Sequence, residues 1–245
     1  AWRGEEEIKP AEWRRESARR LFLLFLTRRR QLLHKEEIMA CLWPDAEPEA
    51  ALRDFKVALN ALMNVLEPGR QPRSPSFFIQ REGAAYYFNL ASGFWLDAEE
   101  FENLVARAQK VADQWPEQAE IQLKRALELY EGDYLQGVFQ DEWCLEERER
   151  LAVFYLRALE LLAKLLARRG DYAGCLKAAG KILEKDNCWE EAYRLQMLCY
   201  GKLNNGAMVT RVYKKCAAVL KEELGANPSG KTAGLYKKLA QKLLT

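Results

Sequence analysis

Residues 48–69, PEAALRDFKVALNALMNVLEPG, predict a single long helix with two contrasting faces. Pro48 suits the first helical position, where its missing N–H breaks no hydrogen bond, and Pro68-Gly69 ends the helix after Leu66. At about 100° per residue, one face is apolar and the other is polar. The apolar face holds Leu52, Phe55, Leu59, Leu62 and Leu66, and the polar face holds Arg53, Lys56, Asn60 and Asn64. We expect the apolar face to pack, which leaves the polar face for solvent or a partner.

Two shorter helices are predicted before this one. Apolar residues recur at helical spacing over residues 17–29, with arginines on both sides. A second helix over residues 35–42 begins after His34 and stops at Trp43, because the proline that follows forbids continuation. Residues 3–9 predict a small hairpin at the start of the chain.

An aromatic hairpin is predicted after the long helix. Residues 70–76 lack periodicity and predict a loop. The aromatic-rich stretches 77–80 and 86–90 favour strands on either side of a turn at Glu82-Gly83. Three helices followed by a hairpin is the order of a winged helix-turn-helix, so base contacts are sought on the third helix.

The polar face of that helix carries residue types that suit DNA. Arg can pair with guanine, Asn can pair with adenine, and Lys can neutralise a phosphate. The same types also cover ordinary surface helices, so both interpretations stay open. Arg81 at the hairpin turn either contacts DNA or is an exposed turn residue. The run Arg28–Arg30 is either a phosphate clamp or a solvated surface at a helix end where the dipole favours positive charge, and the second interpretation is preferred.

Residues 97–245 predict a second, all-helical part. Its breaks fall at 115–116, 132, 170–171, 186–187, 204–206 and 225–230. The breaks at 170–172 and 205–207 recur at about the period of tetratricopeptide-type helical hairpins. The sequence therefore predicts a winged helix-turn-helix domain over 1–96 and a helical-repeat domain over 97–245. The expected interior of the second domain is Leu127, Tyr130, Trp143, Leu151, Tyr155, Leu162 and Leu166.

No catalytic, metal or cofactor site is predicted, and the protein is not expected to be an enzyme. The lone histidine, His34, has no ligand partners nearby, and the six cysteines form no C-x-x-C pair. The carboxylates Asp141, Glu142, Glu146, Glu147 and Glu149 alternate with arginines, as on a solvated helix face. No phosphate-binding glycine loop occurs. The longest apolar run, 21–26, is too short for a membrane helix, so no membrane partner and a cytoplasmic location are expected.

Charge argues for weak DNA affinity in a single copy. The chain has a net charge of +2, and residues 1–100 hold 15 Lys and Arg against 16 Asp and Glu, a net charge of −1. Strong DNA binders usually carry a basic stripe. Cooperation between two copies on a repeated operator would offset this weakness.

Several motifs resemble those of known bacterial regulators. Leu42-Trp43-Pro44-Asp45, followed by the long helix, is similar to the winged helix of regulators built like the Streptomyces antibiotic regulatory proteins. Residues 126–133, 142–151 and 223–229 resemble the bacterial transcriptional activator domain that follows it. The resemblance implies an OmpR-like winged helix and a tetratricopeptide-like domain that bind promoter DNA and help to recruit RNA polymerase. It also implies that Arg53, Lys56, Asn60 and Asn64 enter the major groove, with Arg81 near the wing tip.

A second hypothesis is a protein-interaction or signal-relay module whose winged helix no longer binds DNA. It rests on residues 60–64, NALMN, where such regulators usually carry a basic segment. The short N-terminal hairpin further suggests a fragment of a larger regulator with an ATPase or receiver module upstream.

Overall fold

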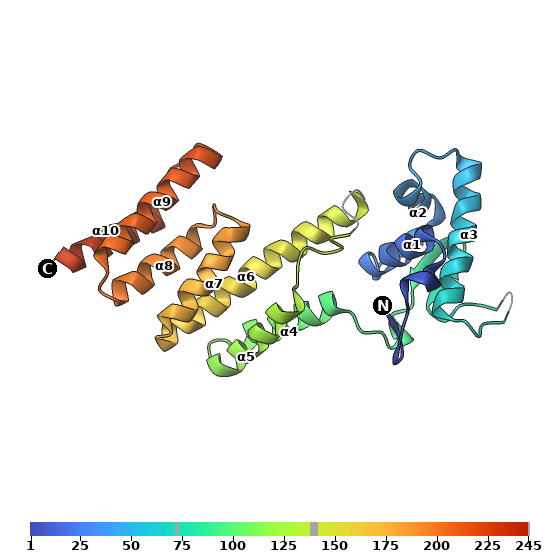
Figure 1. Ribbon diagram of the computed structural model, residues 1–245, viewed down its shortest axis with the longest axis horizontal. Coiled ribbons are helices and arrows are strands. Elements are labelled where there is room, and N and C mark those ends of the chain that lie inside the picture. The colour runs from blue at the N-terminus through green and yellow to red at the C-terminus, as the bar shows by residue number, and fades with distance from the viewer. Residues whose placement is uncertain (72–73, 138–141, 245) are drawn as a thin grey trace. The chain divides into compact units, whose positions relative to one another are not determined.

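A computed structural model describes residues 1–71, 74–137 and 142–244. The protein is mainly helical, and its residues form two compact units (Figure 1). The first comprises residues 1–95 and 134–149, and the second comprises residues 96–133 and 150–245. The sequence predicted one boundary, between residues 96 and 97. In the structure each compact unit instead consists of two separate stretches of the chain. Part of the predicted loop, residues 72–73, and the carboxylate Asp141 lie outside the described residues.

The first unit contains the predicted helices in the predicted order. The long helix has the bounds expected from its flanking prolines, and His34 caps the second helix, whose Glu37 carboxylate accepts the His34 backbone N–H at 2.8 Å. The elements are β1 (Trp2–Arg3), β2 (Glu6–Glu7), the 3-10 helix η1 (Pro10–Trp13), α1 (Glu16–Thr27), β3 (Leu33–His34), α2 (Lys35–Leu42), α3 (Pro48–Leu66), β4 (Ile79–Glu82), β5 (Ala85–Phe88), η2 (Leu90–Ser92) and η3 (Glu142–Cys144).

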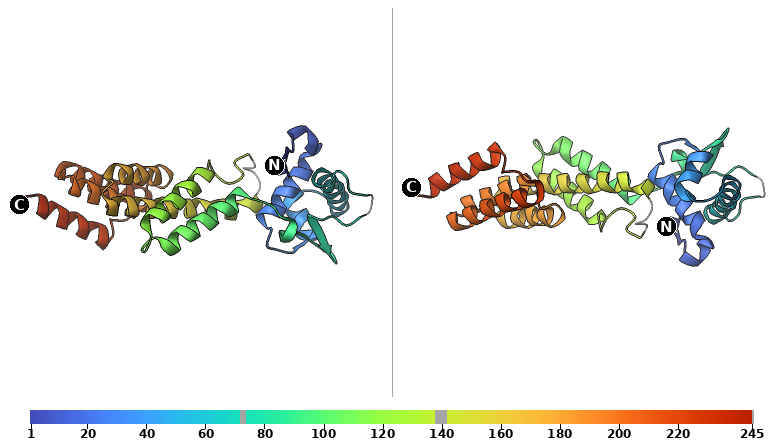
Figure 2. Two further views of the ribbon diagram at one scale, coloured as in Figure 1. Left: turned by 90° about the horizontal axis from the view of Figure 1, so that it is seen from below. Right: turned by 90° about the horizontal axis from the view of Figure 1, so that it is seen from above.

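A small antiparallel sheet in the order β3-β5-β4 completes this unit. Its hairpin turns through Gly83 and Ala84, and Gly83 has a φ of 60°, a conformation that glycine adopts without strain. Figure 2 shows β4 and β5 projecting as a hairpin. Strand β3 was not predicted, because two residues give too short a pattern to show in a sequence.

The core of the first unit is formed by the inner faces of α1, α2, α3 and the sheet. Phe55 of α3 meets Tyr86 of β5 edge to face, with 5.2 Å between ring centroids. The fully or nearly fully buried side chains around them include Leu21, Leu24, Phe25, Ile38, Leu62, Ile79 and Phe88. The amphipathic pattern of α3 therefore packs the helix as the sequence predicted.

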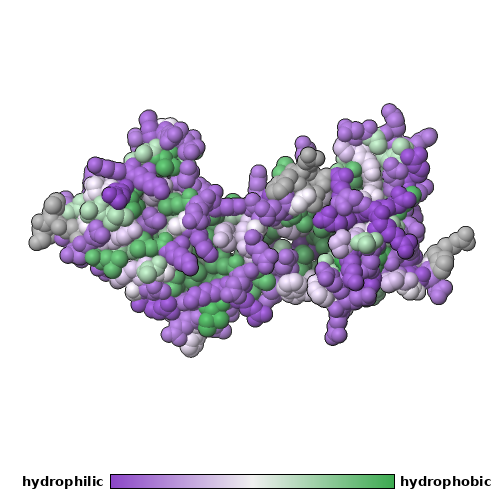
Figure 3. Space-filling model, in the orientation of Figure 1, coloured by the Kyte–Doolittle hydropathy of each residue, from purple (hydrophilic) through white to green (hydrophobic). Residues whose placement is uncertain are grey.

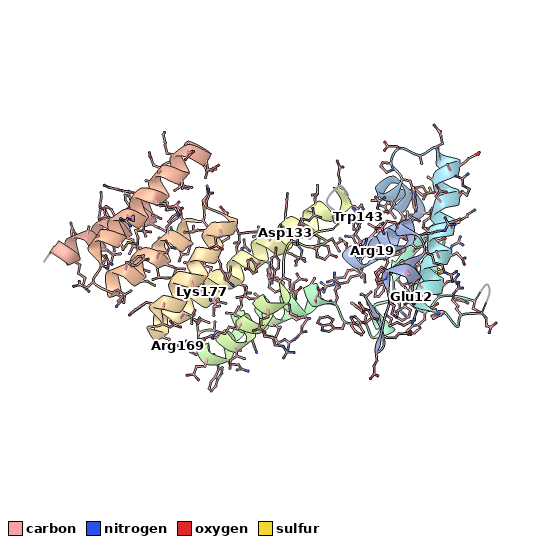
Figure 4. The ribbon with its side chains drawn as sticks, viewed as in Figure 1. Glu12, Arg19, Asp133, Trp143, Arg169 and Lys177 are labelled. Carbon is pink, nitrogen blue, oxygen red and sulfur yellow. The ribbon has the colours of Figure 1, made fainter. Side chains whose placement is uncertain are left out.

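Residues 134–137 and 142–149 return to this core from the middle of the second unit's sequence. Trp143 and Cys144 are buried in the same apolar cluster as α1, and Trp143 is 7% exposed (Figure 4). The Tyr134 hydroxyl lies 2.9 Å from the Thr27 hydroxyl of α1. The Arg148 guanidinium donates to the Tyr134 carbonyl at 2.9 Å and so ties the segment's two ends together. The prediction that Trp143 lies in the helical-repeat interior is wrong.

The second unit consists of helices joined by short connections, except that fifteen residues, 130–144, separate two of them in the chain. The breaks between them fall where glycine, asparagine and proline predicted them. Asp171 and Asn205, 34 positions apart, each accept a backbone N–H three residues ahead and so cap α7 and α9 in the same way. The helices are α4 (Asp97–Val111), α5 (Pro116–Leu129), α6 (Leu145–Arg169), α7 (Tyr172–Lys185), α8 (Glu190–Lys202), α9 (Gly206–Leu224) and α10 (Gly230–Leu244), and α6 begins within the first unit.

Aromatic stacking and buried leucines hold this unit together. Tyr130 stacks on Tyr155 of α6 at 4.2 Å between ring centroids, and Phe101 of α4 meets Phe154 edge to face. Of the predicted interior, Leu151, Leu162 and Leu166 are buried, whereas Leu127, Tyr130 and Tyr155 are half-buried. In the part of the chain that the structure describes, none of the helices combines the length and apolar character needed to cross a membrane.

A network of charged side chains links α6, α8 and the start of α10. Glu191 pairs with Arg194 and lies 3.3 Å from Lys164, and Glu190 accepts hydrogen bonds from the Ser229 backbone and hydroxyl. Burial alone would raise the pKa of both carboxyls, but these partners lower it below the usual range.

The second unit is therefore expected to lose stability in acid. A carboxyl with a lowered folded pKa stabilises the fold above its unfolded pKa of about 4.3, and this stabilisation is lost as the pH falls through the folded value. Urea unfolding followed by circular dichroism should show this fall below about pH 4.3, and a shallower one in Glu190→Gln plus Glu191→Gln protein. Glu128→Gln plus Glu131→Gln, which changes exposed carboxylates, should leave the fall unchanged; an equal effect of both variants would contradict the assignment.

Candidate nucleic-acid interface

Four of the five residues predicted to contact DNA lie on one exposed face of α3. Arg53, Lys56, Asn60 and Asn64 are all exposed. The opposite face is buried through Ala51, Phe55, Ala58, Leu59, Leu62, Val65 and Leu66. Leu52, expected on the packed face, is half-buried because it lies at the edge of that face.

Three of these residues line a groove beside α3. Lys56, Asn60 and Asn64 form one wall of the groove. The segment before α1 forms the other wall, and its η1 helix contacts α3. The groove has a volume of 1130 Å³. Its second wall includes Arg3, Lys9, Glu12, Arg14 and Arg15. The structure thus adds basic residues to the face that the sequence predicted.

The second wall is fixed to the rest of the unit. The Arg3 guanidinium donates to the Val65 carbonyl of α3 at 2.7 Å, and Trp13 packs on Phe22 with 5.4 Å between ring centroids. Arg14, directly after Trp13, has a φ of 49°, which is uncommon for a residue with a side chain. This turn directs the chain from η1 into α1.

The groove carries an excess of positive charge. Arg14, Arg15 and Lys56 are exposed, and among the described residues no carboxylate lies within 4.0 Å of them. The one acidic side chain in the lining, Glu12, lies 3.5 Å from Arg3 (Figure 4). Arginines bracketing the first helix were noted in the sequence, but their position beside α3 depends on packing across some forty residues. The basic character is therefore local and does not show in the net charge.

The other two predicted residues lie outside this groove. Arg53 is one turn ahead of the groove on α3, with its guanidinium 3.2 Å from the Asp54 carboxylate. Arg81 of β4 donates to the Gly83 carbonyl at 2.7 Å and lies 5.7 Å above the Tyr86 ring. Arg81 lines a second groove, of 610 Å³, with Leu59 and Met63 of α3.

The arginine run after α1 is partly built into the fold. Arg29 is buried, and its guanidinium donates to the Leu26 carbonyl at 3.2 Å. The hydrogen bond to a carbonyl of the last turn agrees with a favourable end for the α1 dipole, but the burial of Arg29 contradicts the solvated surface expected there and leaves Arg29 unavailable to a phosphate. Among the described residues, no group of three or more His, Cys, Asp or Glu side chains is arranged to hold a metal ion.

Comparison with known proteins gives matches over both units. Residues 96–240 match the bacterial transcriptional activator domain. The regulatory protein AfsR of Streptomyces coelicolor is 25% identical over 242 residues, which is 98% of this chain but 23% of AfsR. The solved structure of Mycobacterium tuberculosis EmbR in complex with a low-affinity phosphopeptide has a TM-score of 0.83 at 15% identity, covering 93% of this chain and 60% of the EmbR chain.

These matches assign the chain to the bacterial transcription regulators. Within that class, the chain belongs to the bacterial transcriptional activator domain family. It spans less than a quarter of the length of AfsR and about three fifths of the EmbR chain. The similarity to EmbR extends the likeness in fold to most of this chain.

Proposed function

We propose that the protein is an activator that binds double-stranded promoter DNA through α3. In this proposal the first unit is a winged helix-turn-helix, in which α3 enters the major groove and the β4–β5 hairpin is the wing. The observation that carries the proposal is the groove beside α3, where Lys56, Asn60 and Asn64 face a wall of exposed basic side chains.

The residues divide by the part of DNA that they would contact. Arg53, Asn60 and Asn64 can pair with base edges, which gives sequence specificity. Lys56, Arg14, Arg15 and the wing residue Arg81 can contact phosphates, which positions the protein without reading sequence. Arg53 is available to pair with a base because its ion pair with Asp54 is exposed, and such pairs stabilise a fold very little.

The second unit completes the proposal. Its matching caps at Asp171 and Asn205 favour tetratricopeptide-like hairpins, which offer surfaces for protein partners. We assign it contacts with RNA polymerase and with a second copy on a repeated operator. A regulator of this kind acts beside the chromosome, in the cytoplasm.

The test begins with duplexes selected from a random pool by the whole chain. Removing the α3 contacts in Arg53→Ala plus Lys56→Ala protein should weaken binding to a selected duplex by about 10–100-fold, since a base contact such as that of Arg53 is worth roughly 1–3 kcal/mol and the phosphate contact of Lys56 is lost as well. Fluorescence anisotropy in about 50 and 200 mM salt measures the change.

A matched variant separates specific contacts from general charge. Arg19→Ala plus Lys35→Ala removes one arginine and one lysine from other, partly exposed positions of the first unit and should bind almost as wild type does. Unchanged binding in the α3 variant would exclude α3 from DNA recognition. It would favour the protein-interaction module, for which the net charge of the first unit, with 16 Lys and Arg against 18 Asp and Glu, is the supporting observation.

A further inference from the structure

The last part of the second unit is the most basic segment of the chain. Residues 201–245 hold nine Lys and Arg and only two Asp and Glu, a net charge of +7. The first unit, with 16 basic and 18 acidic residues, has a net charge of −2. Positive charge is therefore concentrated far along the chain from the residues proposed to read bases.

Eight basic side chains of this segment are exposed and lack ion pairs among the described residues. Among the described residues, no carboxylate lies within 4.0 Å of any of eight exposed side chains, namely Lys202, Arg211, Lys214, Lys215, Lys221, Lys231, Lys237 and Lys238. The preceding helices differ, because many of their basic residues are paired, namely Lys124, Arg150, Lys164, Arg168, Arg169, Lys185 and Arg194. Clustered charges of one sign repel one another, and they attract a ligand of the opposite charge.

Seven of these side chains lie on two neighbouring helices, α9 and α10, and Lys202 is the last residue of α8. In α9 the buried residues are Val209, Val212, Cys216 and Leu220, and the basic residues lie on the opposite side of the helix. Tyr213 of α9 stacks on Tyr236 of α10, with 4.1 Å between ring centroids and 3° between ring planes. Lys214 and Lys215 directly follow one ring, and Lys237 and Lys238 follow the other. Figure 3 shows hydrophilic residues, with a smaller hydrophobic patch among them, over the end of α9 that is uppermost in Figure 1. We call the eight side chains the C-terminal basic face.

The composition of this face fits a nucleic-acid backbone better than a protein. It consists of seven lysines and one arginine. Protein interfaces are depleted of lysine and enriched in aromatic residues, methionine and arginine. Lysine acts as a point charge that neutralises phosphates without reading bases. Helix α9, at 19 residues, is about 28 Å long, close to one turn of B-form DNA at roughly 34 Å.

We propose that the C-terminal basic face binds the sugar-phosphate backbone of double-stranded DNA without sequence preference. The inference rests on the proposed function and deepens it, because it supplies an affinity that the weakly acidic first unit lacks. Specificity then comes from α3, and much of the salt-dependent affinity comes from α9 and α10.

The test uses the whole chain and a labelled mixed-sequence duplex of about 30 base pairs. In Lys214→Gln, Lys215→Gln, Lys237→Gln, Lys238→Gln protein, the affinity in low salt should fall roughly tenfold or more. The slope of log K against log salt should become shallower by about 3–4, since each neutralised phosphate contributes about 0.9. The affinity of this variant for a selected duplex should fall by a similar factor, because backbone contacts do not distinguish sequences.

A matched control removes the same charge elsewhere on the second unit. Lys110, Arg125, Lys177 and Lys181 are exposed and have no carboxylate within 4.0 Å among the described residues, and Lys177 is labelled in Figure 4. The corresponding four-glutamine variant should keep most of the affinity and slope. An equal loss in both variants would attribute the effect to net charge and overturn the proposal.

The outcomes separate this inference from the proposed function. An unchanged affinity and salt slope in the C-terminal variant overturns the inference, even when the α3 variant loses its selected duplex. An α3 variant that still binds its selected duplex overturns the proposed role of α3, while a salt-slope change in the C-terminal variant still supports the basic face. A wild-type chain that binds neither duplex excludes both, and the face then belongs to an acidic protein partner.

Discussion

Replacing Trp143 with alanine is expected to destabilise the first unit by about 3–5 kcal/mol, although the residue follows α4 and α5 of the second unit in the chain. The indole is 7% exposed and lies in the core cluster that α1 and α3 share. Its removal leaves a cavity that the surrounding side chains can fill only in part. This loss is a large part of the free energy of unfolding of a typical domain, which is about 5–15 kcal/mol.

Hydrogen exchange can locate this effect within the molecule. Amides of α1 and α3 should exchange faster in Trp143→Ala protein, and those of α9 should be unaffected. Trp95→Ala, at a tryptophan that is 68% exposed in the same unit, should change stability by less than about 0.5 kcal/mol. Unchanged exchange in α1 would show that residues 134–149 contribute nothing to this core.

Replacing Phe55 with alanine is expected to destabilise the first unit by a similar amount, about 3–5 kcal/mol. The ring is 1% exposed and meets Tyr86 edge to face, so both packing and an aromatic pair are lost. This contact fixes α3 against the sheet. DNA binding by the Phe55→Ala variant should therefore fall in proportion to its folded fraction. Conditions that raise this fraction, such as cooling, should restore the binding in part.

Comparison with the neighbouring positions distinguishes stability from recognition. Val57→Ala, at a side chain that is 39% exposed on the same helix, should lower the melting temperature little. Arg53→Ala should weaken DNA binding while leaving thermal unfolding unchanged. A structural defect such as Phe55→Ala should instead lower the melting temperature first and DNA binding only as a result. Calorimetry and anisotropy on the same samples provide both measurements, and normal stability in Phe55→Ala protein would contradict the packing of α3.

Local features of the sequence predicted most of the helices. Proline at position 48 and Pro68-Gly69 determine where α3 begins and ends, and His34 caps α2 as expected. The breaks near Asp171 and Asn205 were visible because capping is a short-range interaction. These features depend on residues within one turn of each other, so a single sequence contains the required information.

Long-range packing explains what the sequence did not show. The pairing of β3 with β5 joins residues some fifty positions apart. Trp143 has the same apolar character in either unit's core, so periodicity could not assign it to the first. The basic wall of Arg14 and Arg15 beside α3 likewise depends on how η1 packs, and the four α3 residues alone gave only part of the candidate interface.

The return of residues 134–149 constrains how genes for such proteins can exchange parts. A crossover at the obvious junction near residue 96 would join a parental α1 to a foreign Tyr134 and Trp143, whose partners evolved elsewhere. Only exchanges that transfer residues 1–95 together with 134–149 keep matching partners. Related regulators should therefore inherit these two separated stretches as one evolutionary block.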